Sequence, residues 1–208
     1  MKEKSRLLII GGGGHAESVI DVVESEDTFE IIGLIGRPDE VGATRFGYKI
    51  IGTDDALSEL VKSCQFAVIA VGQIKSADQR IQLYQKAIRY GFQIPNIISP
   101  KAYVSKHAEI GPGTTVMHYA IINAGAKVGA NCIINTRALV EHGVEIADHC
   151  HISTGAILNG EVKIGPKTFV GSGSVIREGR AIGRSCIVGM GLTVHSDLED
   201  FGQLTCNR

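Results

Sequence analysis

Residues 134–158 read INTRALVEHGVEIADHCHISTGAIL, and every sixth residue of this stretch is aliphatic. The spacing continues without a break in both directions, through Ile98, Val104, Ile110, Val116, Ile122, Val128, Ile134, Val140, Ile146, Ile152, Leu158, Ile164, Val170, Ile176, Ile182, Val188 and Val194. The fifth position of each six-residue unit, or hexad, is mostly small, and glycine clusters at the second and fourth positions. Such a repeat predicts a parallel β-helix, in which each hexad forms a short strand and a turn and its aliphatic side chain points inward.

The composition agrees with a narrow β-helix. Of the 208 residues, 26 are glycine, 5% are aromatic and none is tryptophan, whereas an ordinary protein has about 7% glycine. Three of the five cysteines, Cys132, Cys150 and Cys186, fall at the small inward position, where we expect buried apolar residues. The odd number of cysteines and the lack of a CxxC pair argue against disulfides and a zinc ribbon, and they favour a reducing cytoplasm.

The charge balance excludes several classes of partner. The formal net charge is -1, so the chain has no general attraction for nucleic acid or for an anionic membrane. No run approaches the roughly 18 apolar residues that a membrane span needs, and we expect no membrane insertion. The basic and then apolar start, MKEKSRLLII, leads directly into GGGGH without a cleavage-type site, so a buried strand explains it better than a signal peptide.

The first half of the chain alternates between strand and helix patterns. We predict strands over residues 7–10, 30–34, 48–51 and 66–71, and helices over residues 16–24, 54–62 and 77–90. This alternation predicts a parallel, doubly wound sheet. Because Pro95 marks the passage into the repeats, we predict an α/β, Rossmann-like domain over residues 1–95 and a β-helix domain over residues 96–208.

A glycine-rich turn, GGGGH at residues 11–15, follows the first predicted strand. Residues 11–16 fit the dinucleotide pattern G-x-G-x-x-A, and the free N–H groups at a helix N-terminus suit a phosphate or a diphosphate. The second strand ends in LIGR at residues 34–37, without the carboxylate that an NAD site needs, which argues against a redox enzyme. The alternative is a tight turn that needs glycine only for its backbone angles.

A short α/β unit with a GGGH turn, followed by uninterrupted hexads, resembles the sialic acid O-acetyltransferases and nucleotide-sugar N-acetyltransferases of bacterial glycan synthesis (the NeuD/PglD-like family). The resemblance covers nearly the whole chain, and residues 134–153 are its most specific segment. It implies a left-handed β-helix with three hexads per coil, so that residues 18 positions apart stack. It also implies an acetyl-CoA-dependent transferase that acts on an amino-sugar nucleotide and N-acetylates a UDP-4-amino sugar. The transferase is implied to be a homotrimer whose CoA groove lies between subunits.

The resemblance assigns the general base to His142, in the family element (I/V)EH. A neutral imidazole, with an ordinary pKa near 6.5, can take a proton from an amine or a hydroxyl at neutral pH. One coil away stand Ala124 and Gly160, which leave room for a substrate. Gly143 follows the base where relatives often carry Glu or Asp, so the ring either works unassisted or is supported by Glu141, Glu145 or Glu161. The alternative is a solvent-facing histidine without a role.

Ligand-binding residues also follow from the resemblance. The residues implied to bind the uridine nucleotide are Gly13, Gly14, His15 and Gly72. The residues implied to bind acetyl-CoA are His151, Ser172 and Met190, the last two in one column along a prism edge with Thr154. Some relatives carry an acidic pair after the second strand, where this chain has Ile35-Gly36, and the usual C-terminal Gly-x-Pro-Ala segment is missing, which would weaken an adenine pocket.

Several alternatives remain at this point. Within the class, the acceptor could be a sialic acid hydroxyl instead of a sugar amine. A non-catalytic regulator would bind the sugar nucleotide without turnover. A zinc carbonic anhydrase on the same prism needs two histidines five residues apart, which this chain lacks, and residues 148–151 (DHCH) are a weak metal motif because neighbouring strand residues point to opposite faces. We therefore predict acetyl-CoA as co-substrate, no metal, and direct attack on the thioester without an acyl-cysteine.

Overall fold

The computed structural model describes residues 4–205. Its first part is a five-stranded sheet in the order β3-β4-β2-β1-β5. The strands are β1 (Ser5–Ile10), β2 (Phe29–Ile35), β3 (Thr44–Arg45), β4 (Tyr48–Gly52) and β5 (Phe66–Ile69). The helices are α1 (Gly14–Glu26), α2 (Leu57–Leu60) and α3 (Asp78–Tyr90), with 3-10 turns η1 (Pro38–Glu40) and η2 (Asp54–Ala56). All neighbouring strands are parallel except β3 and β4, which confirms the predicted doubly wound unit.

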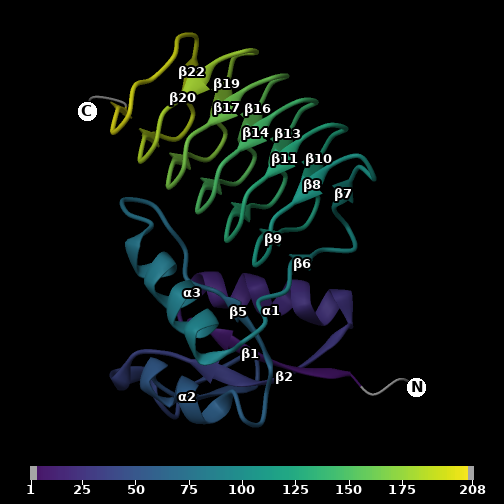
Figure 1. The fold of residues 1–208 in the computed structure, drawn as a ribbon, viewed down its shortest axis with the longest axis vertical. Coiled ribbons are helices and arrows are strands. Elements are labelled where there is room, and N and C mark those ends of the chain that lie inside the picture. Colours follow the sequence, from purple (N-terminus) through teal and green to yellow (C-terminus); the bar gives the residue numbers. More distant parts are fainter. Residues whose placement is uncertain (1–3, 206–208) are drawn as a thin grey trace.

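Two apolar layers hold this sheet. One face of β1, with Leu7 and Ile9, packs against Val19 and Val23 of α1. The other face packs against α2 and α3. Figure 1 shows α1 lying between the sheet and the coils of the second part, and the apolar layer around α1 also includes Ile97 and Met117 of the second part.

The predicted helix over residues 54–62 is wrong in extent. A 3-10 turn occupies Asp54–Ala56, and α2 ends at Leu60. Leu57 is the only buried residue of α2, so packing stabilises little more than one helical turn. Strand β3 was not predicted, since it is only two residues long and pairs with β4 through a turn at Phe46 and Gly47.

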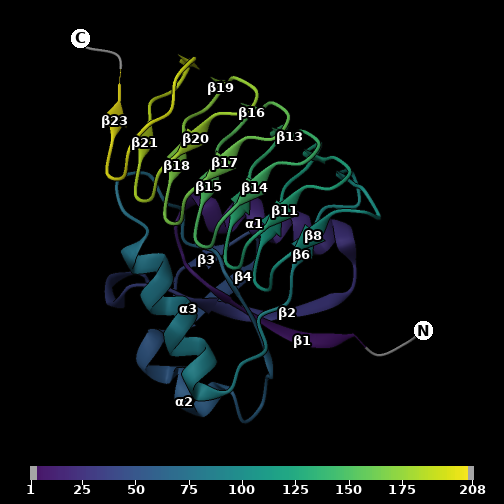
Figure 2. The same ribbon diagram turned by 45° about the horizontal axis from the view of Figure 1, so that its top comes forward.

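The second part is a three-sided parallel β-helix of two-residue strands (Figure 2). The first sheet contains β6 (Ile97–Ile98), β9 (Thr115–Val116), β12 (Ile133–Ile134), β15 (His151–Ile152), β18 (Phe169–Val170), β21 (Ile187–Val188) and β23 (Gln203–Leu204). The second contains β7 (Tyr103–Val104), β10 (Ile121–Ile122), β13 (Leu139–Val140), β16 (Ile157–Leu158), β19 (Val175–Ile176) and β22 (Thr193–Val194). The third contains β8 (Glu109–Ile110), β11 (Lys127–Val128), β14 (Glu145–Ile146), β17 (Lys163–Ile164) and β20 (Ala181–Ile182).

The predicted hexad register is confirmed. The aliphatic residues form one continuous core, fully buried from Val116 onward and partly buried at Ile98, Val104 and Ile110. Residues 18 positions apart pair between coils, as Ile122 does with Val140. The cysteines expected to point inward, Cys132, Cys150 and Cys186, are buried and free. The predicted boundary between residues 95 and 96 stays a prediction; α3 ends at Tyr90 and β6 begins at Ile97.

The three sheets differ in their outward residues. We name the first the domain-facing sheet, because α1 and its neighbours cover it; Ile97 and Ile133 on it are fully buried. The second is the apolar sheet, whose outward residues are Tyr103, Ile121, Leu139, Ile157, Val175 and Thr193, all at least partly exposed. The third is the charged sheet, whose outward residues are Glu109, Lys127, Glu145, Lys163 and Ala181.

Polar contacts fix the two parts to each other. Arg80, on α3, is fully buried; its Nε donates to the Asn131 carbonyl at 3.2 Å, and its Nη1 donates to the Ile69 carbonyl at 2.7 Å. A second contact lies at α1, where His118 Nε2 is 2.7 Å from Asp21 Oδ2. The carboxyl end of β5 and helix α1 are thereby held against the second part. No helix between residues 4 and 205 has the length and apolarity needed to span a membrane.

Candidate functional site

A pocket of about 690 Å³ opens at the carboxyl ends of β1 and β5. The turn between β1 and α1 lines one wall, and its course depends on Gly11. The φ angle of Gly11 is +142°, and a Cβ there would lie 2.7 Å from the Ala70 carbonyl carbon. Glycine therefore lets the turn pass directly over β5 and open towards the pocket.

All four residues predicted to bind the nucleotide line this pocket: Gly13, Gly14, His15 and Gly72. Gly13 is the N-cap of α1, so the first N–H groups of the helix are available to a ligand. A Cβ on Gly13 or Gly14 would meet no atom within 4 Å, which means that the space beside them is open. The arrangement suits a diphosphate; nucleotide binding by these residues stays a prediction.

His15 and His151 bring the two parts of the molecule together, with ring centroids 6.4 Å apart. Burial, followed by the charge of Arg80, lowers the pKa of His15 to about 3. Burial likewise lowers the pKa of His151 to about 4. Both rings are therefore neutral at neutral pH, and they add no positive charge beside the pocket.

The hydrogen bonds of His151 define its tautomer. Nδ1 lies 2.6 Å from the Gln73 carbonyl oxygen, which can only accept, so Nδ1 carries the proton and donates. Nε2 then accepts from the Asn135 amide nitrogen at 3.1 Å. Sequence reasoning did not single out Asn135 or Gln73. Asn135 lies inside the most specific segment of the family resemblance, which is the one signal that could have found it.

A second pocket of about 630 Å³ lies beside the first. It is lined by the three residues predicted to bind acetyl-CoA, His151, Ser172 and Met190. Ser172 and Met190 belong to the first corner, the edge between the domain-facing and apolar sheets, and Thr154 stacks in the same column. The loop after β5 separates the pockets, since Gly72 lines the first and Ile74 lines the second. CoA binding by these residues stays a prediction.

His142 lies at the second corner, the edge between the apolar and charged sheets, and its side chain is exposed as predicted. Its ring passes over Gly160, where a Cβ would lie only 2.2 Å from His142 Cε1. Glycine at position 160 is therefore required for this orientation of the ring, and the ring itself occupies the space over Gly160 that was expected to admit a substrate.

The carboxylate support considered for His142 is not found within residues 4–205. Glu141 Oε2 accepts from the His142 backbone N–H at 3.3 Å and from Asn123 Nδ2 at 3.0 Å, so it binds the backbone and not the ring. Glu145 pairs with Lys163. Gly143 has a φ angle of +67°, a left-handed conformation that closes the corner and favours glycine.

One chain does not bring all the predicted residues together. His142 lines a separate hollow of about 550 Å³ with Glu141, Asn159, Gly160 and Glu161, among others. The apolar sheet lies between this corner and the corner that carries Ser172 and Met190. Between residues 4 and 205, no three His, Cys, Asp or Glu side chains are grouped so that they could hold a metal ion.

Family models match both parts of the chain. The family model described as the PglD N-terminal domain matches residues 6–87. The model for the bacterial transferase hexapeptide (six repeats) matches residues 107–141, and the hexapeptide repeat of succinyl-transferase matches residues 161–196. No curated protein sequence gives a significant match.

Several solved structures are similar. PerB from Caulobacter crescentus, in complex with CoA and GDP-perosamine, is 33% identical with a TM-score of 0.91, over 97% of this chain and 94% of that chain. The acetyltransferase domain of PglB from Neisseria gonorrhoeae, in complex with acetyl coenzyme A, is 30% identical with a TM-score of 0.90, over 98% and 97%. WeeI from Acinetobacter baumannii shares the fold. It is 22% identical with a TM-score of 0.84, over 97% of each chain.

An α/β domain with a glycine-rich pocket, joined to an uninterrupted hexapeptide β-helix, is the architecture of a hexapeptide-repeat transferase. The sequence identity to PerB and to the PglB domain, over nearly the full length of each chain, assigns the chain to one family within this class. The chain belongs to the PglD family of nucleotide-sugar acetyltransferases.

Proposed function

We propose that the protein transfers the acetyl group of acetyl-CoA to the amine of an amino-sugar nucleotide. The observation that carries this proposal is the pair of adjoining pockets that meet at His15 and His151. The first offers backbone N–H groups to a diphosphate, and the second is a partly apolar groove that suits the pantetheine arm. PerB holds CoA and GDP-perosamine, and the PglB domain holds acetyl coenzyme A. That the nucleoside of the acceptor is uridine stays a prediction, and a cytoplasmic location of the protein stays a prediction as well.

His142 is the proposed general base. It takes a proton from the sugar amine while the amine nitrogen attacks the thioester carbonyl carbon. The C–N bond forms, the C–S bond breaks, and the departing thiolate takes up the proton that His142 received, so that CoA leaves as the thiol. The exposed position of His142 over Gly160 supports this role. Structures of perosamine N-acetyltransferase with one histidine replaced by asparagine or alanine also contain CoA and GDP-perosamine.

The three cysteines of the β-helix do not favour an acyl-enzyme, because Cys132, Cys150 and Cys186 are all buried in its core. Burial also raises the pKa of the Cys150 thiol well above its ordinary value, and it raises the pKa of the Cys186 thiol. A buried thiol that keeps its proton is a poor nucleophile. Direct attack of the amine on acetyl-CoA therefore fits these residues better than a covalent intermediate.

The proposed site is complete only in a homotrimer. The apolar sheet has the second corner, with His142, along one edge and the first corner, with Ser172 and Met190, along the other. In a cyclic trimer packed through this sheet, each edge faces the opposite edge of the next subunit. His142 of one subunit then lies beside the acetyl-CoA pocket of its neighbour. The partly exposed apolar side chains of this sheet are suited to such an interface.

We expect Ile157→Glu to convert the trimer into monomers, because it places a charge at the centre of the apolar sheet. The side chain points outward, so the coil itself should fold. Light scattering should give about three times the subunit mass of 22.2 kDa for the wild type and one subunit mass for the variant. Ala181→Glu, at an outward position of the charged sheet next to Lys163, is the matched control and should remain trimeric. A trimeric Ile157→Glu protein would contradict the proposed interface.

Acetyl transfer is tested by release of the CoA thiol. The acceptors are UDP-, GDP- and dTDP-linked 4-amino sugars and free sialic acid, each at several concentrations. We expect saturable thiol release with one nucleotide-linked amino sugar, together with an acetylated product of matching mass. Release with sialic acid alone would instead establish O-acetylation, and tight binding of a nucleotide sugar without any release would indicate a regulator.

A further inference from the structure

The carboxyl end of the second strand has a particular importance in Rossmann-type folds, because an acidic residue there holds the ribose hydroxyls of a bound nucleotide. Strand β2 ends at Ile35, and Gly36 and Arg37 follow, so the sequence places no carboxylate at this point. The structure nevertheless brings one there. It is the carboxylate of Glu40, five residues after the end of the strand.

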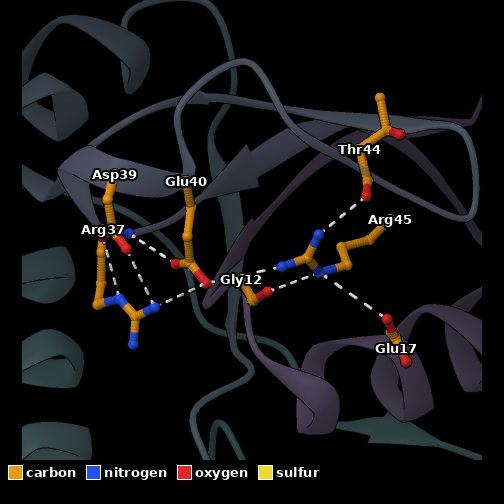
Figure 3. A network of polar contacts seen from close by, with 7 residues as sticks. All are labelled: Gly12, Glu17, Arg37, Asp39, Glu40, Thr44 and Arg45. Carbon is orange, nitrogen blue, oxygen red and sulfur yellow. Dashed lines mark hydrogen bonds and ion pairs between the residues drawn. The ribbon is translucent and has the colours of Figure 1, made fainter.

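The turn η1 folds Glu40 back towards β2 (Figure 3). The Arg37 backbone N–H donates to Glu40 Oε2 at 3.0 Å, and the Glu40 N–H donates to the Arg37 carbonyl at 3.0 Å. The side chain of Glu40 is 15% exposed and lines the pocket at the glycine-rich turn. A Cβ on Gly12 or on Gly36 would lie 3.1 Å from Glu40 Oε2, so the carboxylate stands between the turn and the end of β2.

Arg45, on β3, holds Glu40 from the other side. Its Nε donates to the Gly12 carbonyl at 2.8 Å, and its Nη2 lies 3.6 Å from Glu40 Oε1. Arg37 Nη2 lies 3.4 Å from the same oxygen. Figure 3 shows the carboxylate between the two guanidinium groups and next to Gly12. A carboxylate has about four acceptor sites, so this held but incompletely hydrogen-bonded group can still accept from a ligand.

We propose that Glu40 accepts the hydrogen bonds of the ribose hydroxyls, and that the acceptor substrate is therefore a ribonucleotide sugar and not a 2′-deoxyribonucleotide sugar. The proposal rests on the assignment of this pocket to the sugar nucleotide. Its reason is positional: Glu40 occupies the place of the usual acid at the end of β2, and Arg37 and Arg45 fix its direction.

The experiment measures the affinities of UDP, GDP and their 2′-deoxy counterparts by calorimetry. The wild type is expected to bind each ribonucleotide about tenfold more tightly than its deoxy counterpart, as a hydrogen bond to a charged group implies. Glu40→Gln should weaken ribonucleotide binding about tenfold and leave deoxynucleotide binding nearly unchanged. The preference for the ribose is the readout, because a merely structural role of Glu40 would not change it.

Asp39→Asn is the matched control. Asp39 is the neighbouring acid and also pairs with Arg37, but it does not line the pocket, so its variant should keep the ribose preference. The proposal would be overturned if the wild type bound the ribonucleotide and its 2′-deoxy counterpart with equal affinity. It would also be overturned if Glu40→Gln lowered the affinities for both nucleotides equally. If no nucleotide binds the wild type, the assignment of the pocket to the sugar nucleotide fails as well. If nucleotides bind without a preference for ribose, only the role of Glu40 fails.

Discussion

His142→Ala is expected to reduce the turnover of acetyl transfer by roughly 10²–10⁴-fold, the usual range for removal of one general base. The affinity for acetyl-CoA should change little, because proton transfer contributes in the transition state and not in the ground state. The β-helix should remain intact, since the side chain is exposed at the second corner. The measurement is thiol release with the acceptor identified in the screen, with CoA affinity and the melting temperature determined on the same samples.

His107→Ala is the matched control for this measurement. It removes another exposed histidine near the second corner, at an earlier coil, and should leave turnover unchanged. Near-normal turnover of His142→Ala would show that His142 is not the base. A variant that also loses CoA binding or melts at lower temperature would indicate a structural role instead.

Two inactive variants are expected to restore activity when they assemble together. Gly13→Val should abolish nucleotide binding, because its side chain would extend into the open space beside the glycine-rich turn. If each site takes His142 from one subunit and its pockets from the next, every mixed trimer of His142→Ala and Gly13→Val contains one intact site. Co-expression with two different tags and tandem purification should then give about a third of the wild-type turnover per trimer.

The control for this experiment is a mixture of the two variants, each purified separately as a trimer, under conditions in which subunits do not exchange. This mixture should stay inactive, as should each variant alone. Absence of activity in the purified mixed trimers, with each parent variant trimeric, would mean that His142 and the nucleotide pocket act within one chain. That result would contradict the shared site but not the acetyl transfer itself.

The fold was largely readable from the sequence because a β-helix is built from local, repeated rules. Each hexad supplies one inward aliphatic side chain, and each coil contacts only the coils beside it, so the register of Val116 or Val140 follows from spacing alone. The glycine-rich turn was also visible, since its glycines and the following helix are consecutive in the chain. The extent of α2 could not be predicted from the sequence, because it depends on the packing of the single buried residue of this helix, Leu57.

The residues of the candidate site were predicted from the family resemblance of the sequence, but their grouping was decided only by the tertiary structure. The sequence determined the hexads, the pocket-forming glycines and an exposed His142. It placed no acid at the end of β2, because Glu40 reaches that point through the turn η1 and is held there by Arg45. Arg45 also bonds to Gly12, which is distant from it in the chain. Likewise, spacing cannot say which sheet of the prism stays uncovered. That depends on where the α/β domain docks, and docking leaves the apolar sheet open between His142 and the acetyl-CoA pocket.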